Sequence, residues 1–421
     1  MKTSPKFLTA CSSILLGAIL FGSVFGANAA ISAQHDQKFE IELFKKVSAQ
    51  KAKENVLVSP LSASLALGMV LNGASGPNKQ EMCRVMGTSA DKLDQFNSRN
   101  KSVIASLNAS KDVTLEVANA VYSDKKTPFQ KSFVDLCKSV YSAAAENLDF
   151  EQKFETLAAI NSWCSEKTHG KISKILTDLK ETDKMVLLNA IYFKGKWSEQ
   201  FQKAATRDQN FAVEKGKNIK VKMMHRTGEL RYYQGDNFAA ISLPYRGGKQ
   251  SMYVFLPDEG VSVNAFQAKL TGENWKKWMS SFTQERVAVS LPKLKIEFED
   301  ELNKALKTMG MNLAFMEDTP GLFSGLVTSP AKAGLNIPGA NPNVDFIAWI
   351  SKVVQKTFME VSEEGTEAAA VTAVVMGCSA PCVTPQPKII DFTVDHPYVL
   401  ALVDEQSGEI LFMGKILKPQ S

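Results

Sequence analysis

Residues 363–382 read EEGTEAAAVTAVVMGCSAPC, and this stretch near the C-terminus poses the question that decides the fold. From Thr366 to Met376 it holds neither Pro nor Gly, and its only charge is Glu367. Such a run of Thr, Ala, Val and Met favours a β-strand, and an exposed strand of this kind invites pairing with another chain. The tract that follows, GCSAPCVTPQPK, has the composition of a loop. The stretch is therefore either an ordinary buried strand or a strand that waits to be inserted.

The 421 residues are 44% hydrophobic and 22% charged, which is an ordinary globular balance. The net charge of +5 is small and no dense Lys/Arg cluster is present, so nucleic-acid binding is not expected. Helical patterns come mostly first and strand patterns mostly later, without a linker or repeat, which predicts one α+β domain over 30–421. We expect helices at 36–53, 129–146, 153–170 and 300–314, a buried central strand at 185–197, and mostly strands from about 208 to 300.

The N-terminus has the pattern of a secretory signal peptide. Lys2 and Lys6 precede an apolar stretch over 7–25, and Ala27-Asn28-Ala29 fits a small-x-small cleavage site. We expect cleavage after Ala29 and export to an extracellular or periplasmic space, with a membrane anchor as the alternative. The Lys-led pattern favours a bacterial source, and no later segment is long and apolar enough to span a bilayer.

The cysteines do not form a disulfide scaffold. Once Cys11 leaves with the signal, five remain, so at least one thiol is free or pairs with another chain. Cys378 and Cys382 have no metal-site spacing, and we expect no metal. They are either two free thiols or a strained, easily reduced disulfide.

No catalytic constellation is visible. None of the four histidines lies in an HExxH motif, and GxSxG, P-loop and GxGxxG patterns are absent. The sequence therefore predicts no enzyme and no cofactor, although a hydrolase with an unfamiliar site stays an alternative.

Several long motifs in order carry a family resemblance. They are NVLVSPLSASLALGMVLNGASG at 55–76, VLLNAIYFKGKW at 186–197, EVSEEGTEAAAVTAVV at 360–375 and DHPYVLALVDEQSGEILFMGKILKP at 395–419. Over about 36–419 the chain resembles the serpins, the serine protease inhibitor family. The resemblance implies a metastable α+β fold with three β-sheets, eight or nine helices and an exposed reactive-centre loop at about 363–387. It also implies suicide inhibition, in which a protease cleaves the loop, forms an acyl-enzyme and is trapped when the loop enters the central sheet.

The residues of the loop fit insertion. An inserting strand alternates its faces, so Thr366, Ala368, Ala370, Thr372 and Val374 would point inward while Glu367 points to solvent. The hinge comprises Gly365, Thr366, Glu367, Ala368, Ala369 and Ala370. Because neither Pro nor an inward charge interrupts it, we expect an inhibitor, with a non-inhibitory carrier or interaction protein as the alternative.

The resemblance places the cleaved bond fourteen residues after Gly365, between Ser379 and Ala380, with Cys378 and Met376 as alternatives. No Lys or Arg lies between 366 and 387. The expected partner is a protease with a small or apolar primary pocket, elastase-, subtilisin- or papain-like, and the inhibitor is expected to be a monomer.

The resemblance also assigns roles to positions outside the loop, and some of these positions depart from the family pattern. Ser59, Ser62 and Asn189 match a polar cluster beneath the central sheet, although helix capping and strand polarity explain them equally. Gln355 stands where the family usually has His, and Gln can both donate and accept hydrogen bonds. Trp197 matches the point of loop entry, and 326–345 is a Gly/Pro/Asn-rich insertion of unknown purpose.

Overall fold

The computed structural model describes residues 37–109, 113–328, 347–366 and 388–420. Its α-helices are α2 (Lys38–Gln50), α3 (Pro60–Leu71), α4 (Gly76–Val85), α5 (Leu93–Asn108), α6 (Lys131–Tyr141), α7 (Lys153–Lys167), α8 (Val263–Lys269), α9 (Gly272–Ser280) and α10 (Asn303–Thr308). Its strands are β1 (Val56–Val58), β2 (Val113–Asp124), β3 (Ala144–Leu148), β4 (Met185–Lys196), β5 (Arg207–Glu214), β6 (Lys217–Gly235), β7 (Phe238–Pro244), β8 (Gln250–Pro257), β9 (Thr283–Pro292), β10 (Leu294–Glu301), β11 (Ile350–Val361), β12 (Gly365–Thr366), β13 (Ile390–Thr393), β14 (Tyr398–Asp404) and β15 (Ile410–Ile416).

A six-stranded sheet in the order β10-β11-β12-β4-β2-β3 forms the centre. Its long strand β4 confirms the prediction of a strand buried on both faces, because alternate side chains of β4 enter two separate apolar cores. β4 and β11 run parallel and pair directly from Met185 opposite Ile350 to Tyr192 opposite Phe358. We call this line of pairing the seam, since the two-residue strand β12 lies between the same two strands at one end of it.

The nine-stranded sheet has the order β1-β15-β14-β8-β7-β6-β9-β13, with β5 added beside β6. Its long strand β6 pairs with β5 in its first half and with β7 in its last residues. This sheet therefore consists of two parts that are joined through β6 and β9. The two parts and the central sheet together correspond to the three expected sheets.

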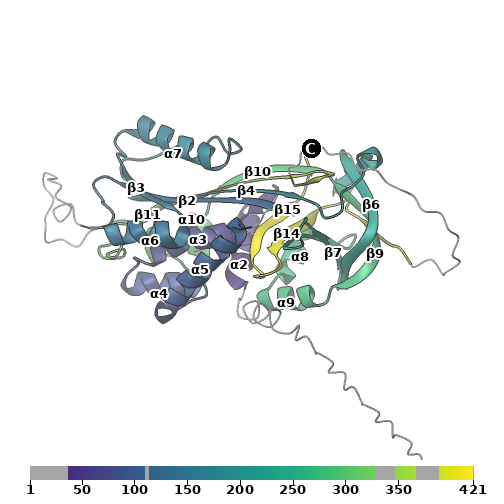
Figure 1. Ribbon diagram of the computed structural model, residues 1–421, viewed down its shortest axis with the longest axis horizontal. Coiled ribbons are helices and arrows are strands. Elements are labelled where there is room, and N and C mark those ends of the chain that lie inside the picture. The colour runs from purple at the N-terminus through teal and green to yellow at the C-terminus, as the bar shows by residue number, and fades with distance from the viewer. Residues whose placement is uncertain (1–36, 110–112, 329–346, 367–387, 421) are drawn as a thin grey trace, which may run out of the picture. The chain divides into compact units, whose positions relative to one another are not determined.

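Helices cover both faces of the central sheet. Figure 1 shows α7 on one face and α3, α5 and α6 on the other. Helix α3 is buried along its whole length, and its start follows from the sequence, because Ser59 is the N-cap and Pro60 occupies the first turn.

The fold differs from expectation in several places. The helix expected at 300–314 is limited to α10 at Asn303–Thr308, and α4 and α5 lie where no helix was expected. The stretch from 208 to 300 holds the helices α8 and α9 among its strands. Helix α6 ends at Tyr141, before the expected end at 146, because Ser142 takes the left-handed conformation at φ 50° and Ala144–Leu148 joins the central sheet as β3.

The predicted signal peptide at 1–29 lies outside the described residues, as does most of the insertion at 326–345. Within the described ranges, none of the helices has the length and hydropathy needed to cross a membrane.

Candidate functional site

The first feature of the site is the end of the seam from which the chain continues toward the predicted reactive-centre loop. Strand β12 lies between its neighbours there, with Thr366 opposite Gly195 of β4 and Val361 of β11. Gly365 has φ +150°, and a Cβ at this position would lie 2.1 Å from the carbonyl oxygen of Gly195. Only glycine fits this approach of two backbones.

Two stacked aromatic side chains, Trp197 and Tyr245, contact β12 and the residues just before it. The hydroxyl of Thr366 is fully buried, and it lies 2.6 Å from the hydroxyl of Tyr245. The Tyr245 ring stacks on Trp197, with centroids 4.4 Å apart, and burial raises the pKa of Tyr245 far above its usual range. Trp197 donates from Nε1 to the Ser362 carbonyl at 2.9 Å and from its backbone N–H to the Glu364 carbonyl at 3.0 Å. Trp197 therefore lies beside β12, while its stacking partner Tyr245 was not anticipated.

Two neighbouring carboxylates anchor the chain just before β12. Glu363 and Glu364 are both buried, and each pairs with a lysine from another segment. Glu363 accepts from Lys293 at 3.0 Å and from Thr206 at 2.9 Å, and Lys203 lies 2.5 Å from Glu364. Burial by itself would raise the pKa of Glu363, but hydrogen bonds from the backbone, Lys293 and Thr206 outweigh burial and lower it.

The polar cluster lies in the middle of the seam. Gln355 Oε1 accepts from the backbone N–H of Ser59 at 2.9 Å. Gln355 Nε2 donates to the Ser59 carbonyl at 2.8 Å and to Asn189 Oδ1 at 2.6 Å. Asn189 Nδ2 in turn donates to Ser62 Oγ and, at 2.5 Å, to Asn119 Oδ1. The structure thus brings Ser59, Ser62, Asn189 and Gln355 together and adds Asn119 of β2 to them.

This cluster bridges the two strands of the seam. Gln355 and Asn189 are direct partners in the parallel ladder of β11 and β4. All five side chains are buried, and Ser59 Oγ also donates to the Leu411 carbonyl of β15 at 2.6 Å. The Gln355–Asn189 bond therefore joins β11 and β4 directly across the seam.

Features that would support an enzyme are weak. His225 and Ser290 face each other across β6 and β9 with Nδ1 and Oγ 2.9 Å apart, but in the described part of the chain no carboxylate is bonded to His225 to orient it. The thiols of Cys83, Cys137 and Cys164 are free and buried, and burial raises their pKa values, to about 12 for Cys137 and Cys164. No group of three metal-ligating side chains is found among the described residues.

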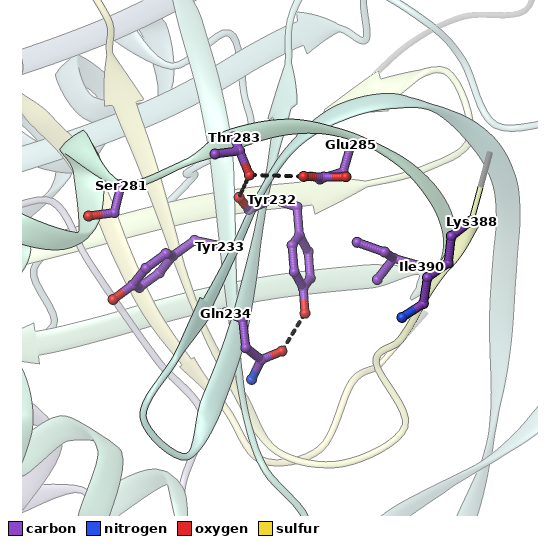
Figure 2. A pocket seen from close by; sticks show the side chains of 8 residues that line it. All are labelled: Tyr232, Tyr233, Gln234, Ser281, Thr283, Glu285, Lys388 and Ile390. Carbon is purple, nitrogen blue, oxygen red and sulfur yellow. Dashed lines mark hydrogen bonds between the residues drawn. The ribbon is translucent and has the colours of Figure 1, made fainter.

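A cavity of about 520 Å³ lies against β6, β9 and the start of β13 (Figure 2). Tyr232 donates to Gln234 Oε1 at 2.5 Å within it, and Thr283 donates to Glu285 Oε1 at 3.2 Å. Its lining contains neither histidine nor cysteine; it is formed by Tyr232, Tyr233, Gln234, Ser281, Thr283, Glu285, Lys388 and Ile390. The lining therefore lacks the Ser–His or Cys–His pairing of an activated nucleophile.

The reactive-bond candidates Met376, Cys378, Ser379 and Ala380 lie outside the described residues, as do the hinge residues Glu367, Ala368, Ala369 and Ala370. Of the functional residues missed from the sequence, Tyr245 and Asn119 gave no local signal, since their partners are 121 and 70 positions away in the chain. Lys203 and Lys293 had one weak signal. Two adjacent glutamates that become buried between two strands require cationic partners.

Comparisons with known proteins agree with this architecture. The family model described as serpin (serine protease inhibitor) matches residues 34–419. An uncharacterized serpin-like protein from Thermococcus kodakarensis is 33% identical over 385 residues, covering 91% of this chain and 84% of that protein. Serpin B8 of Homo sapiens is 35% identical over 390 residues, covering 90% and 97%. The chain belongs to the serpin family.

Solved structures show the same fold. The thermophilic serpin tengpin in its native state has a TM-score of 0.80 at 30% identity, with 93% of this chain and 94% of that chain covered. Thyroxine-binding globulin, solved in complex with thyroxine, has a TM-score of 0.78 at 25% identity, with 93% and 100% covered. The expectation of a serpin fold is therefore confirmed.

Proposed function

We propose that this serpin is a suicide-type protease inhibitor whose cleaved loop enters the central sheet at the seam. The observation that carries the proposal is β12, which already lies between β4 and β11 while the seam beside it is closed. A strand that starts in this position needs no further search for its register. Each residue that follows would be placed by the ladder that Thr366 begins.

The register can be extended by counting. Thr366 lies opposite Gly195 and Val361 in antiparallel pairing, so each step forward in the loop moves one step back along both neighbours. Six steps bring Thr372 opposite Asn189 and Gln355, which are partners of each other in the closed seam. Thr372 would point to the same face as Thr366, so its hydroxyl could replace part of the bond that insertion breaks.

The residues on both faces suit this path. Thr366 points into the core beside Tyr245, and the residues at even positions that follow are Ala368, Ala370, Thr372 and Val374. None is charged, so insertion would bury no unpaired charge on this face. Glu367 would fall on the opposite face, which the alternation of the strand directs toward solvent.

The finer parts of the proposal rest on the sequence. The Ser379–Ala380 bond is the proposed cleavage site, with Cys378 and Met376 as alternatives, and the proposed partner is an elastase-, subtilisin- or papain-like protease. Export after removal of residues 1–29 and a monomeric state are proposed with it. The relatives include archaeal, mammalian and plant proteins, so they lend no support to a bacterial source.

The test is incubation of the purified chain with a panel of elastase-, subtilisin-, papain- and trypsin-like proteases. We expect an SDS-stable covalent complex with at least one protease of the first three classes and none with the trypsin-like enzyme. Cleaved but uncomplexed chain should melt at a markedly higher temperature than intact chain, because the inserted strand completes the ladder on both sides. Cleavage with neither a complex nor a rise in melting temperature would instead favour a non-inhibitory carrier.

A further inference from the structure

The inner face of the nine-stranded sheet carries two opposite charges where the apolar core ends. On β9, Val287 is buried in the core, and the inward position before it on the strand is Glu285. On β13, Ile390 pairs with Val287 and packs against the same core. Lys388 lies two residues before Ile390, just as Glu285 lies two residues before Val287. A carboxylate and an ammonium ion therefore lie on neighbouring segments just beyond the core.

These two charges do not neutralise each other. Neither Glu285 nor Lys388 forms an ion pair with any residue that the structure describes. Their side chains have one hydrogen bond there, which Glu285 Oε1 accepts from Thr283 at 3.2 Å. A charge on an inward position normally has a partner, because its removal from water without one is costly. A ligand that carries one positive and one negative group would supply both missing partners.

The cavity of about 520 Å³ in Figure 2 lies between these charges. Figure 2 shows Ile390 beside the Tyr232 ring, with the Glu285 carboxylate and the Lys388 ammonium at different ends of the cavity. Burial raises the pKa of Tyr232, and the negative charges of Asp258 and Glu285 raise it further. One end of the cavity is thus negative, its middle is apolar and its other end is positive. Its volume falls within the range of about 300–1,000 Å³ that is typical of small-molecule sites.

We propose that this cavity binds a small zwitterion with an apolar body, which is the chemistry of a short free peptide. The amino group of the ligand would donate to Glu285, and its carboxylate would accept from Lys388. An apolar side chain of the ligand would lie between the Tyr232 ring and Ile390. The inference stands apart from the proposed function, because no residue of the seam lines the cavity.

The test uses the intact chain and three forms of one dipeptide, leucyl-phenylalanine. The free dipeptide carries both charges, its N-acetyl form lacks the positive charge, and its C-terminal amide lacks the negative charge. Binding of each form is measured by isothermal titration calorimetry. We expect wild-type protein to bind the free dipeptide about tenfold more tightly than either capped form, because each capped form loses one partly exposed charge-assisted hydrogen bond.

Five variants assign each end of the ligand to a side chain. Glu285→Gln should bind the free and N-acetyl forms equally and still prefer the free form to the amide. Lys388→Met should show the reverse, because it removes the partner of the carboxylate. Tyr232→Ala should weaken all three forms by a similar factor, since it removes only the apolar contact. Glu229→Gln and Lys295→Met change exposed charges outside the cavity, and both should bind as wild type does.

The wild-type measurements decide the proposal even if a variant fails to fold. Absence of saturable binding of the free dipeptide would overturn the proposal, and so would equal affinity for all three forms. If Glu285→Gln keeps the wild-type preference for a free amino group, the amine does not bind at Glu285. Weakening by Glu229→Gln equal to that by Glu285→Gln would show attraction by the net charge of the protein instead of a site, and it would overturn the proposal as well.

Discussion

Replacement of Gln355 by leucine tests whether the polar cluster holds the seam closed. Leucine has a similar volume but can neither donate nor accept a hydrogen bond. In the intact protein the change removes three bonds, two with Ser59 and one with Asn189. The Ser59 carbonyl keeps its helical bond from the Ala63 N–H at 3.1 Å. The Ser59 N–H and Asn189 Oδ1 are left buried without a partner.

The cost follows from these two groups. A buried polar group that loses its partner costs about 1–3 kcal/mol, so we expect the intact variant to lose about 2–6 kcal/mol of stability. In the loop-cleaved form the proposed register would put Thr372 between Asn189 and Gln355, so their direct bond would already be absent. The cleaved variant should then lose only about half as much stability, because the direct Gln355–Asn189 bond is no longer there to be removed.

The assay is urea unfolding of intact and loop-cleaved protein, followed by tryptophan fluorescence, with the shift in midpoint converted through the slope. Thr357→Val is the matched control on the same strand. Thr357 donates to the Leu57 carbonyl of β1 at 2.8 Å and does not bridge the seam, so its loss should affect both forms equally. If Gln355→Leu also affects both forms equally, or neither, the cluster does not hold the seam closed.

Three further predictions concern single residues. Thr366→Arg should convert the inhibitor into a substrate that is cleaved without complex on SDS gels, because Thr366 is fully buried against Tyr245; complex at the wild-type yield would contradict this. Glu363 has a lowered pKa, so it stabilises the fold above its ordinary value of 4.5 and loses this effect as the pH falls through the folded value. Glu363→Gln should have a lower urea midpoint than wild type at pH 7, and the difference should shrink as the pH falls below 4.5. Burial lowers the pKa of Lys415 to about 8 from 10.5, so between these pH values the unfolded chain binds more protons than the folded chain and stability rises with pH. The urea midpoint of wild type should therefore rise relative to that of Lys415→Met from pH 8 to 10.5. A difference in midpoint that does not change over this range would contradict the lowered pKa.

Local patterns were sufficient for several long elements, although α5 was not expected. The apolar run at 185–197 predicted β4 because a strand buried on both faces needs apolar residues at every position. Helices α8 and α9 were missed although their caps are visible in the sequence. Ser262 accepts from the Ala265 N–H and Thr271 from the Asn274 N–H, each three residues on, which is the spacing of an N-cap. Their short length within a strand-rich stretch hid this signal.

Some residues of the candidate site could likewise be predicted from the sequence, and others could not. Ser59, Ser62, Asn189 and Trp197 were found because each lies in a motif whose order and spacing match the family. Gln355 was found because it stands where the family usually has His. The lysines that pair with Glu363 and Glu364 come from segments 70 or more positions away in the chain. The adjacent glutamates indicate that cationic partners are needed, but no local pattern shows which lysines supply them.

The sequence by itself determined that residues 366–376 can become a strand, since β propensity and the alternation of small inward residues are properties of consecutive positions. Only the tertiary structure decided where that strand begins. The φ of Gly365, the pairing of Thr366 with Gly195 and Val361, and the closed Gln355–Asn189 bond set its register and the barrier ahead of it. The reason is physical: hydrogen bonds between strands depend on distances between residues far apart in the chain, and those distances exist only once the sheet has formed.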